Sequence, residues 1–303
     1  MNIAEFQSIV IPADAGNDRR EATRDGSHAK PRQFKDIERR SRWSMIDPRE
    51  IWQYRDLLFV LAMRDVKLRY RQALLGVCWV VLQPLLSAGV FAFVFGHVLK
   101  TPSDGVPYMV FCFAGMLVFN AFSGTLSRSS ACIVGNSQLI SKIYFPRLVL
   151  PLSTVFATLI DFAVGLALMF VILALGRIGL GWRVLLLPAW IVLAIGLAVG
   201  LGLYTCAAMV RYRDLQYVIP VLLQLILYAS PIAYPMSAAP AHLRTWLYLN
   251  PLSSLLEACR WSLLGRGAIS GPWILYSVTC VIVSLLIGAT AFKRLERDFA
   301  DVI

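Results

Sequence analysis

The 303-residue chain is 58% hydrophobic and only 16% charged, and its mean hydropathy is +0.65. A helix that crosses a membrane needs about 20 mostly apolar residues, and a soluble domain does not contain repeated runs of that length. Composition therefore excludes an ordinary soluble protein and favours an all-α integral membrane protein. Six transmembrane helices are predicted, over Leu74–Leu99, Tyr108–Ser127, Leu148–Leu175, Val184–Val210, Gln216–Tyr234 and Trp273–Phe292.

The net charge of +11 indicates the orientation of these helices rather than a nucleic-acid partner. Lysine and arginine are enriched in cytoplasmic loops because they are poorly translocated. With both termini in the cytoplasm, most of the 29 lysines and arginines fall on the inner side, and no basic stripe lies on a soluble domain. The few cationic residues assigned to the outer side are Lys100, Arg177, Arg183, Arg244, Arg260 and Arg266.

The amino-terminal region divides into a polar tail and a helix. Residues 1–46 are polar, mixed in charge and lack the apolar stretch of a signal peptide, so a disordered cytoplasmic tail is predicted. Asp47 and Pro48 then provide a helix cap and a first-turn proline. An amphipathic helix in the cytoplasmic membrane interface is expected over residues 47–71, with a plain linker as the alternative. Residues 72–298 form the predicted six-helix transmembrane domain.

Two inner connections follow from the same topology. The connection between the fourth and fifth spans, residues 211–215, is short and basic and is therefore placed inside. The connection between the second and third spans, residues 128–147, is longer than a turn. A short helix along the membrane surface is expected there, with one apolar side formed by Leu139, Ile140 and Ile143.

The outer connection between the fifth and sixth spans contains several prolines. Asn250 and Pro251 provide a helix cap and a first-turn proline. Two short helices that dip into the outer leaflet are predicted, His242–Leu249 and Leu252–Leu264. Such broken structure is tolerated at membrane depth only where protein or a cavity shields it.

Motifs for catalysis and cofactor binding are absent from the sequence. There is no Gly-Lys dipeptide and hence no phosphate-binding P-loop, and neither G-x-S-x-G nor H-E-x-x-H occurs. The three histidines are isolated, and the six cysteines form no C-x-x-C pair and lie mostly in apolar runs. No metal or cofactor bound by this chain is therefore expected, and the cysteines are interpreted as small buried hydrophobic residues.

Asp161, near the middle of the third predicted span, is the main acidic residue expected within an apolar run. An ionised carboxylate at that depth costs about 2.5–3.5 kcal/mol on insertion scales, so it needs a partner. Three roles remain open: a hydrogen bond to a neighbouring helix, the lining of a wet pathway, or a contact with another subunit.

Several motifs are similar, in order, to those of one transporter family. They are RYRQALLGVCWVVLQP over residues 69–84, NSQLISKIYFPRLVLP over 136–151, YRDL over 212–215, SPIAYPM over 230–236 and LNPL over 249–252. Together they resemble the permeases of polysaccharide-export ABC transporters, which include O-antigen and teichoic-acid exporters. The resemblance covers roughly residues 47–298, and the long polar amino terminus departs from the shorter members.

The resemblance implies a homodimer of six-span subunits in the bacterial inner membrane, paired on the cytoplasmic side with two copies of a separate ATPase. It implies a lipid-linked polysaccharide as the substrate, O-antigen in first place, and no enzymatic activity for this chain itself. A capsule or teichoic-acid exporter, and a related exporter of drugs or small molecules, remain alternatives. A membrane-embedded transferase is a further alternative, but a catalytic set of His, Asp or Glu near one membrane face is missing.

The cationic collar and the resemblance indicate residues for substrate entry and for energy coupling. Arg69 and Arg71, in a cationic collar with Arg64 and Lys67, are candidates for binding the pyrophosphate of the lipid carrier, because arginine can hold phosphate oxygens with paired hydrogen bonds. Anchoring of the first span is the competing explanation, and the collar by itself favours it. The Asn250-Pro251 helix pair resembles the outer gate of the family. The residues that correspond to the ATPase contact are Ser137, Gln138, Leu139, Ile140, Ile143 and Tyr144.

Aromatic residues are the candidates for lining a polysaccharide conduit. Each sugar ring has an apolar face of C–H groups, on which an aromatic ring can stack without fixing one register of the chain. Aromatic residues also pack helix cores and form interfacial belts, which is the competing explanation. The residues proposed to line the conduit are Phe91, Phe95, Tyr108, Phe119, Tyr228 and Tyr234.

Overall fold

A computed structural model describes residues 52–71, 78–142, 145–267 and 269–296, so the predicted tail and the helix start at Asp47 lie outside the described residues. The described chain is helical and contains no strand, which confirms the all-α class. Its elements are α3 (Arg55–Arg71), α4 (Cys78–Phe91), the π-helix η2 (Ala92–Val98), α5 (Tyr108–Gly135), α6 (Ser137–Lys142), α7 (Val149–Leu175), the 3-10 helix η3 (Trp182–Leu186), α8 (Leu187–Arg211), α9 (Leu215–Ala229), the 3-10 helix η4 (Met236–Ala238), α10 (Ala241–Leu249), α11 (Pro251–Leu264) and α12 (Gly271–Leu295).

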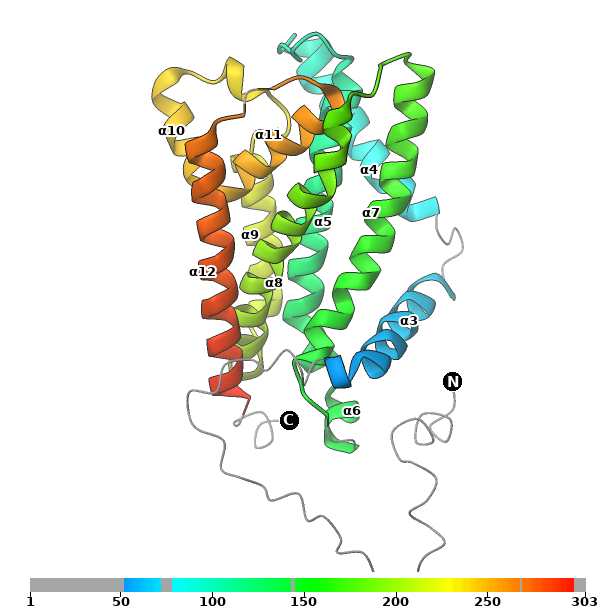
Figure 1. Ribbon diagram of the computed structural model, residues 1–303, viewed down its shortest axis with the longest axis vertical. Helices are drawn as coiled ribbons and strands as arrows, with labels where there is room; N and C mark the ends of the chain where they lie inside the picture. Colours follow the sequence, from blue (N-terminus) through cyan, green and yellow to red (C-terminus); the bar gives the residue numbers. More distant parts are fainter. Residues whose placement is uncertain (1–51, 72–77, 143–144, 268, 297–303) are drawn as a thin grey trace, which may run out of the picture. The chain divides into compact units, whose positions relative to one another are not determined.

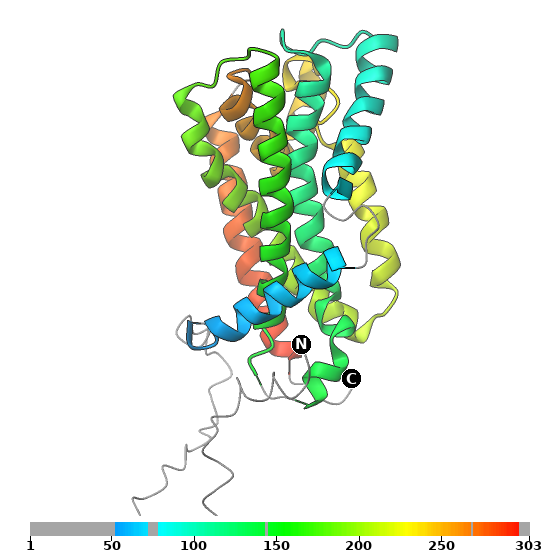
Figure 2. The same ribbon diagram turned by 90° about the vertical axis from the view of Figure 1, so that its right-hand side faces the viewer.

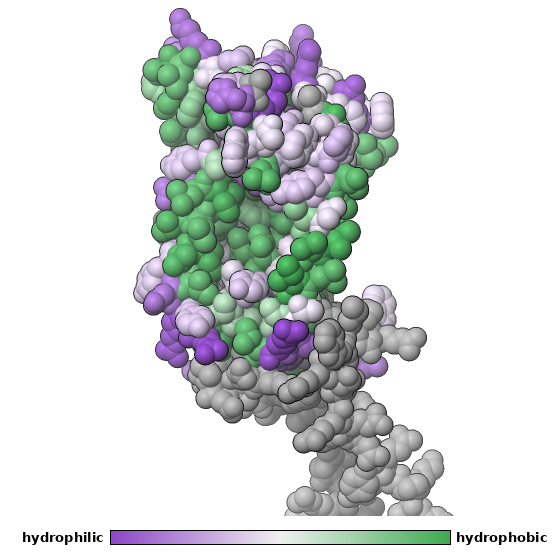
Figure 3. Space-filling view, turned by 90° about the vertical axis from the view of Figure 1, so that its left-hand side faces the viewer, coloured by the Kyte–Doolittle hydropathy of each residue, from purple (hydrophilic) through white to green (hydrophobic). Residues whose placement is uncertain are grey.

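Five helical segments among the described residues are long and apolar enough to cross a membrane: Val81–Val98, Tyr108–Gly135, Val149–Leu175, Trp182–Arg211 and Gly271–Leu295. Figure 3 shows one face of the bundle, on which apolar side chains cover much of the middle and hydrophilic side chains gather toward the two ends. Large side chains such as Leu175, Leu185 and Val192 are exposed in this chain. Lipid is the medium in which such a surface is stable.

The bundle is built around α5 and α8, which pack against each other, while α12 packs on the other side of α8 (Figure 1). Glycines allow α8 and α12 to approach closely. A Cβ atom at Gly200 would lie 2.5 Å from the backbone carbonyl carbon of Ser284, and one at Gly288 would collide with the carbonyl oxygen of Gly200. Small residues at helix crossings are typical of membrane bundles, because close backbone approach replaces the hydrophobic effect as the source of attraction.

Helix α5 is the most enclosed of the crossing segments, and two of its buried serine hydroxyl groups have partners on α5 or α8. The Ser129 Oγ donates to the Thr125 carbonyl oxygen at 2.6 Å, and the Ser130 Oγ lies 2.5 Å from the Thr205 Oγ1 of α8. The sequence predicted an end at Ser127, but α5 continues to Gly135. The continuation is possible because Arg128, the first residue beyond the predicted end, forms an ion pair with Asp161 of α7.

The fifth predicted span is shorter than expected. Helix α9 ends at Ala229, whereas the prediction continued to Tyr234. Ser230 has an extended backbone, with ψ at 147°, because the ring of Pro231 disfavours helical geometry in the residue before it. Tyr234 therefore lies in a non-helical segment between α9 and η4.

The end of the bundle that carries α6 is called the inner end, and the opposite end the outer end, after the predicted topology. At the inner end, α3 lies obliquely across α7, as Figure 2 shows. The side chains of Leu57, Leu61 and Ala62 are buried. Arg64 attaches the helix to the corner between α5 and α6, since its Nη2 donates to the Asn136 Oδ1 at 2.7 Å. One member of the cationic collar thus has a structural partner inside the bundle.

The two short outer helices predicted from the sequence are confirmed as α10 and α11. The Asn250 Oδ1 accepts the backbone N–H of Leu252 at 3.1 Å, and Pro251 occupies the first helical position. The Asn250 Nδ2 also donates to the Ser230 Oγ at 3.0 Å, which links the start of α11 to the end of α9. Both helices lie at the end of the bundle opposite α6 (Figure 1).

Candidate functional site

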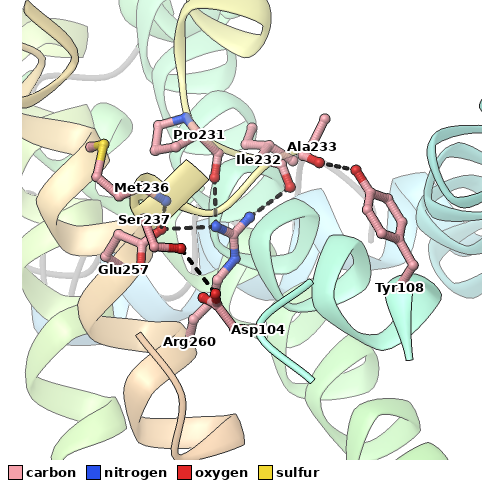
Figure 4. Close-up of polar contacts among 9 residues, drawn as sticks. All are labelled: Asp104, Tyr108, Pro231, Ile232, Ala233, Met236, Ser237, Glu257 and Arg260. Atoms are coloured by element: carbon pink, nitrogen blue, oxygen red, sulfur yellow. Dashed lines mark hydrogen bonds and ion pairs between the residues drawn. The ribbon is translucent and has the colours of Figure 1, made fainter. Parts of the chain in front are cut away.

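A buried ion pair on α11 organises the outer end of the bundle. The Arg260 Nη1 lies 3.1 Å from the Glu257 Oε1, and the two residues are only 1% and 3% exposed. The same guanidinium group donates to the carbonyl oxygens of Pro231 and Ile232, each at 2.6 Å. Figure 4 shows Arg260 reaching from α11 to the Ser230–Met236 segment, which connects α9 to η4.

Other groups hold the same segment from α5 and α11. The Tyr108 hydroxyl, at the start of α5, donates to the Ala233 carbonyl oxygen, and the Met236 N–H donates to the Glu257 Oε1 at 3.4 Å. We call these residues, Tyr108, Glu257 and Arg260 with the backbone of Ser230–Met236, the outer polar cluster (Figure 4). It fixes the segment over the outer ends of two helices that are distant in sequence.

One face of the planar Arg260 guanidinium group packs against an aromatic ring. Its Cζ lies 3.9 Å from the ring centroid of Phe111, a cation–π contact. Burial raises the pKa of the Glu257 carboxyl, and the neighbouring Arg260 opposes that shift. Gly115 leaves space for the guanidinium group, because a Cβ atom at this position would lie 2.5 Å from the Arg260 Nη2. Acceptors therefore hold both Nη atoms of the guanidinium beside an aromatic face, while its Nε has no hydrogen-bond partner among the described residues.

This cluster is not evident from the sequence, which places Arg260 among the cationic residues of the outer side and predicts no role for Glu257. The available signal was a Glu and an Arg three residues apart on an otherwise apolar helix face, a spacing that brings the two side chains together. Only the tertiary structure shows that the pair faces inward.

A second polar group lies between α5 and α7, on the α6 side of the outer polar cluster. The Arg128 Nη2 is 2.6 Å from the Asp161 Oδ2, and its Nη1 donates to the Thr158 Oγ1 at 3.1 Å. Asp161 thus has the partner that a carboxylate within an apolar span requires, and this partner is Arg128 on the neighbouring helix α5. The pair lines a cavity of about 190 Å³ among α4, α5 and α7, here called the inner polar cavity, with Gln83, Pro84, Leu117, Asn120, Ala121, Ser123, Gly124, Thr158, Phe162 and Gly165.

The proposed conduit aromatics do not gather at one place within this chain. Phe91 and Phe95 stack with ring centroids 5.8 Å apart, and Phe119 is buried against Phe122. Tyr228 is 62% exposed on α9. Tyr108 belongs to the outer polar cluster.

Phe95 and Tyr234 share an outer apolar cavity of about 550 Å³ with Trp246 of α10. Two of the six nominated residues therefore face the same open space.

The inner candidates are only partly described. Ser137, Gln138, Leu139 and Ile140 lie on α6, the short helix expected in this connection, while Ile143 and Tyr144 lie outside the described residues. Arg69 and Arg71 are placed at the end of α3, but their side chains fall outside the described part. Within the described residues, no group of three or more His, Cys, Asp or Glu side chains is arranged to hold a metal ion.

A family model and several known proteins match this chain along most of its length. Residues 56–264 match the family described as ABC-2 type transporter. The chain is 32% identical to the O-antigen export system permease protein RfbA of Myxococcus xanthus, over 84% of this chain and 98% of that protein. It is 28% identical to RfbA of Klebsiella pneumoniae, over 82% and 95% of the two chains. It is 27% identical to the polysialic acid transport protein KpsM of Escherichia coli, over 78% and 92%. The chain therefore belongs to the ABC-2 type transporter family.

Proposed function

We propose that this chain is the membrane-spanning permease of an ABC transporter that exports a lipid-linked polysaccharide, O-antigen in first place. The observation that carries the proposal is its similarity to the Myxococcus xanthus permease along 98% of that protein, because a match of that extent includes both the spans and the outer helices. Relatives named for polysialic acid and capsule polysaccharide indicate that the substrate class is a glycan chain, whichever glycan is exported.

The proposal includes six crossings with both termini in the cytoplasm. Helix α9 has 15 residues and rises by about 22 Å, less than the hydrocarbon core of about 30 Å. The Ser230–Met236 segment continues from α9 toward α10 and supplies the remaining depth, shielded by the outer polar cluster. In Figure 1, the carboxyl ends of α8 and α12 lie at the same end of the bundle as α6, as this topology requires. Most lysines and arginines belong to the segments that the topology assigns to the cytoplasm, which supports this orientation.

Energy would come from a separate ATPase, two copies of which bind at the inner end. The absence of a Gly-Lys dipeptide from the sequence supports this division of labour. Helix α6 is the proposed contact, since it projects beyond α5 at the inner end (Figure 1). Helix α3, lying across α7 in the cytoplasmic interface, would hold the neighbouring surface in place.

A second copy of the chain would complete the conduit. Only Ile219 and Leu223 of α9 are buried, so most of this apolar helix lacks a protein partner in one subunit. Helices α4 and α9 lie on the same side of the bundle, at the right of Figure 2. A homodimer formed through that side would enclose the exposed Tyr228 and place it beside the proposed path.

The test of this function is deletion of the gene in its own bacterium, followed by complementation. We expect loss of surface polysaccharide and accumulation of lipid-linked glycan inside, both restored by the wild-type chain. Co-purification with an ATPase whose hydrolysis stops when its catalytic glutamate is replaced is expected as well. Normal surface glycan in the deletion strain, with loss of drug resistance instead, would favour the small-molecule exporter and reject the glycan proposal.

The aromatic conduit needs its own measurement. Alanine replacement of each nominated residue should reduce surface polysaccharide in those that line the path, while the complex still folds and hydrolyses ATP. Phe119 serves as an internal comparison, because its burial against Phe122 predicts a loss of folded protein rather than a selective loss of export. Normal export by the variants at Phe95, Tyr228 and Tyr234 would remove the case for stacking.

A further inference from the structure

The inner polar cavity extends from the cytoplasmic side of the bundle toward its middle. Helix α5 has 28 residues and is about 42 Å long, so it extends about 6 Å beyond each side of a 30 Å hydrocarbon core. Arg128 lies about 10 Å from the Gly135 end of α5, and Asn120, which also lines the cavity, lies about 22 Å from it. The cavity therefore begins just inside the cytoplasmic boundary of the hydrocarbon and reaches about its midplane, so molecules of the inner leaflet can enter it.

The charges of this cavity compensate each other. The Arg128 guanidinium is engaged by the Asp161 carboxylate at 2.6 Å and by the Thr158 hydroxyl at 3.1 Å. An incoming phosphate would have to compete with a carboxylate already in place, and an incoming cation would face a guanidinium group. The electrostatics favour an uncharged ligand.

The remaining polar groups are suited to hydroxyl groups. The side-chain amides of Gln83 and Asn120 each offer two donors and an acceptor, and no hydrogen bond to either amide is seen within the described residues. Gln83 is exposed and stands at the α4 side of the cavity. Unpaired amides at this depth are costly unless water or a ligand satisfies them.

Small residues create the space. A Cβ atom at Gly124 would come no closer than 3.8 Å to the Thr158 Cγ2, so the α5 wall is open there. The volume of about 190 Å³ holds about six water molecules, or one pyranose ring in their place. A cavity of this size, open beside α4, admits one sugar unit and excludes a longer segment of glycan.

We propose that the inner polar cavity binds one uncharged sugar ring of an amphipathic glycolipid, through the amides of Gln83 and Asn120 and the Arg128–Asp161 pair. The assignment of that sugar to the exported molecule rests on the proposed function. The proposed binding of a sugar ring is independent of that function, because a glycolipid resident in the inner leaflet would present the same hydroxyl groups. The site would hold the first sugar of the substrate at the inner leaflet before the glycan enters the conduit.

Binding is tested with the full chain in its complex with the ATPase, in nanodiscs, using two probes with the same tail. Bound dodecyl glucoside and dodecyl phosphate are counted by native mass spectrometry. We expect the glucoside to be retained at least about tenfold better than the phosphate. Asn120→Leu and Gln83→Leu each remove hydrogen bonds to the ligand and should weaken glucoside binding by about 3- to 10-fold. Gly124→Phe, which fills the cavity, should abolish it.

Two control variants separate binding from folding. Thr279→Val and Thr290→Val each remove a hydroxyl on α12 that bonds only to carbonyl groups of its own helix, and neither residue lines the inner polar cavity. Both should bind the glucoside as the wild type does. Equal or preferred binding of dodecyl phosphate, or unchanged glucoside binding by Asn120→Leu and Gly124→Phe, would overturn the site.

Surface polysaccharide measured in cells that carry the same variants identifies the source of the sugar. Loss of export together with loss of glucoside binding assigns the site to the exported substrate. Loss of binding with normal export assigns it to a resident glycolipid. Failure of the proposed function would appear separately, as a wild-type chain that binds glucoside but restores no surface glycan.

Discussion

Replacement of Arg260 by methionine tests the outer polar cluster most directly. Methionine has a similar length and suits an apolar site, so the change removes the charge and the donors without leaving a large void. The variant leaves the carbonyl oxygens of Pro231 and Ile232 without the guanidinium, and leaves Glu257 buried without its counter-ion. The Ser230–Met236 segment would lose its main attachment to α11.

The magnitude follows from the contacts. Two charge-assisted hydrogen bonds contribute about 1.5–3 kcal/mol each, which gives a loss of about 3–6 kcal/mol in the free energy of unfolding. Breaking a buried ion pair by removing one partner costs about 3–5 kcal/mol, in agreement with that sum. At about 2–4 °C per kcal/mol, the thermal midpoint should fall by about 6–24 °C.

The assay is the thermal midpoint of the purified complex, followed by size-exclusion chromatography of the folded fraction. Arg244→Met is the matched control, because Arg244 also donates to two carbonyl oxygens, those of Ser237 and Ala239, but on an exposed surface. Water replaces those bonds, so its midpoint should change by less than about 3 °C. A double variant, Glu257→Gln with Arg260→Met, should recover part of the loss because no charge is left unpaired. Equal midpoints for the two single arginine variants would refute the reasoning.

Three further predictions concern the bundle and its inner end. Gly288→Ala should strongly reduce the folded yield, measured by fluorescence-detected size exclusion, because the new methyl group would collide with the backbone of α8; a normal profile would contradict the packing described. Joint replacement of Leu139 and Ile140 by aspartate should uncouple ATP hydrolysis from export, measured separately in vesicles and in cells, and normal transport by an assembled complex would exclude α6 as the coupling contact. Replacement of Arg69 and Arg71 by lysine keeps the anchoring charge but loses paired phosphate binding, so export should fall several-fold while the topology is unchanged. Full export by that variant would leave anchoring as the sole role of these two residues.

The sequence alone determined the class and most of the helical segments. Runs of apolar residues define membrane helices by length, and the cost of an unpaired peptide group in lipid leaves few other structures available. The short outer helices were also predicted, because Asn250 and Pro251 signal a helix start through local hydrogen bonding. Each of these inferences depends on interactions within a few residues of chain.

The tertiary structure decided the ends of helices and the partners of charged groups. Arg128 looked like the first residue of an inner loop, yet it is helical because Asp161 lies opposite it on α7. Arg260 looked like an outer surface charge, yet it is buried because acceptors from Pro231 and Ile232 meet it there. A charged side chain is stable inside a membrane protein only beside its partner, and its partner is set by the packing of helices distant in sequence. The inner and outer polar sites are therefore formed by the tertiary structure, and the sequence alone does not show which of their residues lie together.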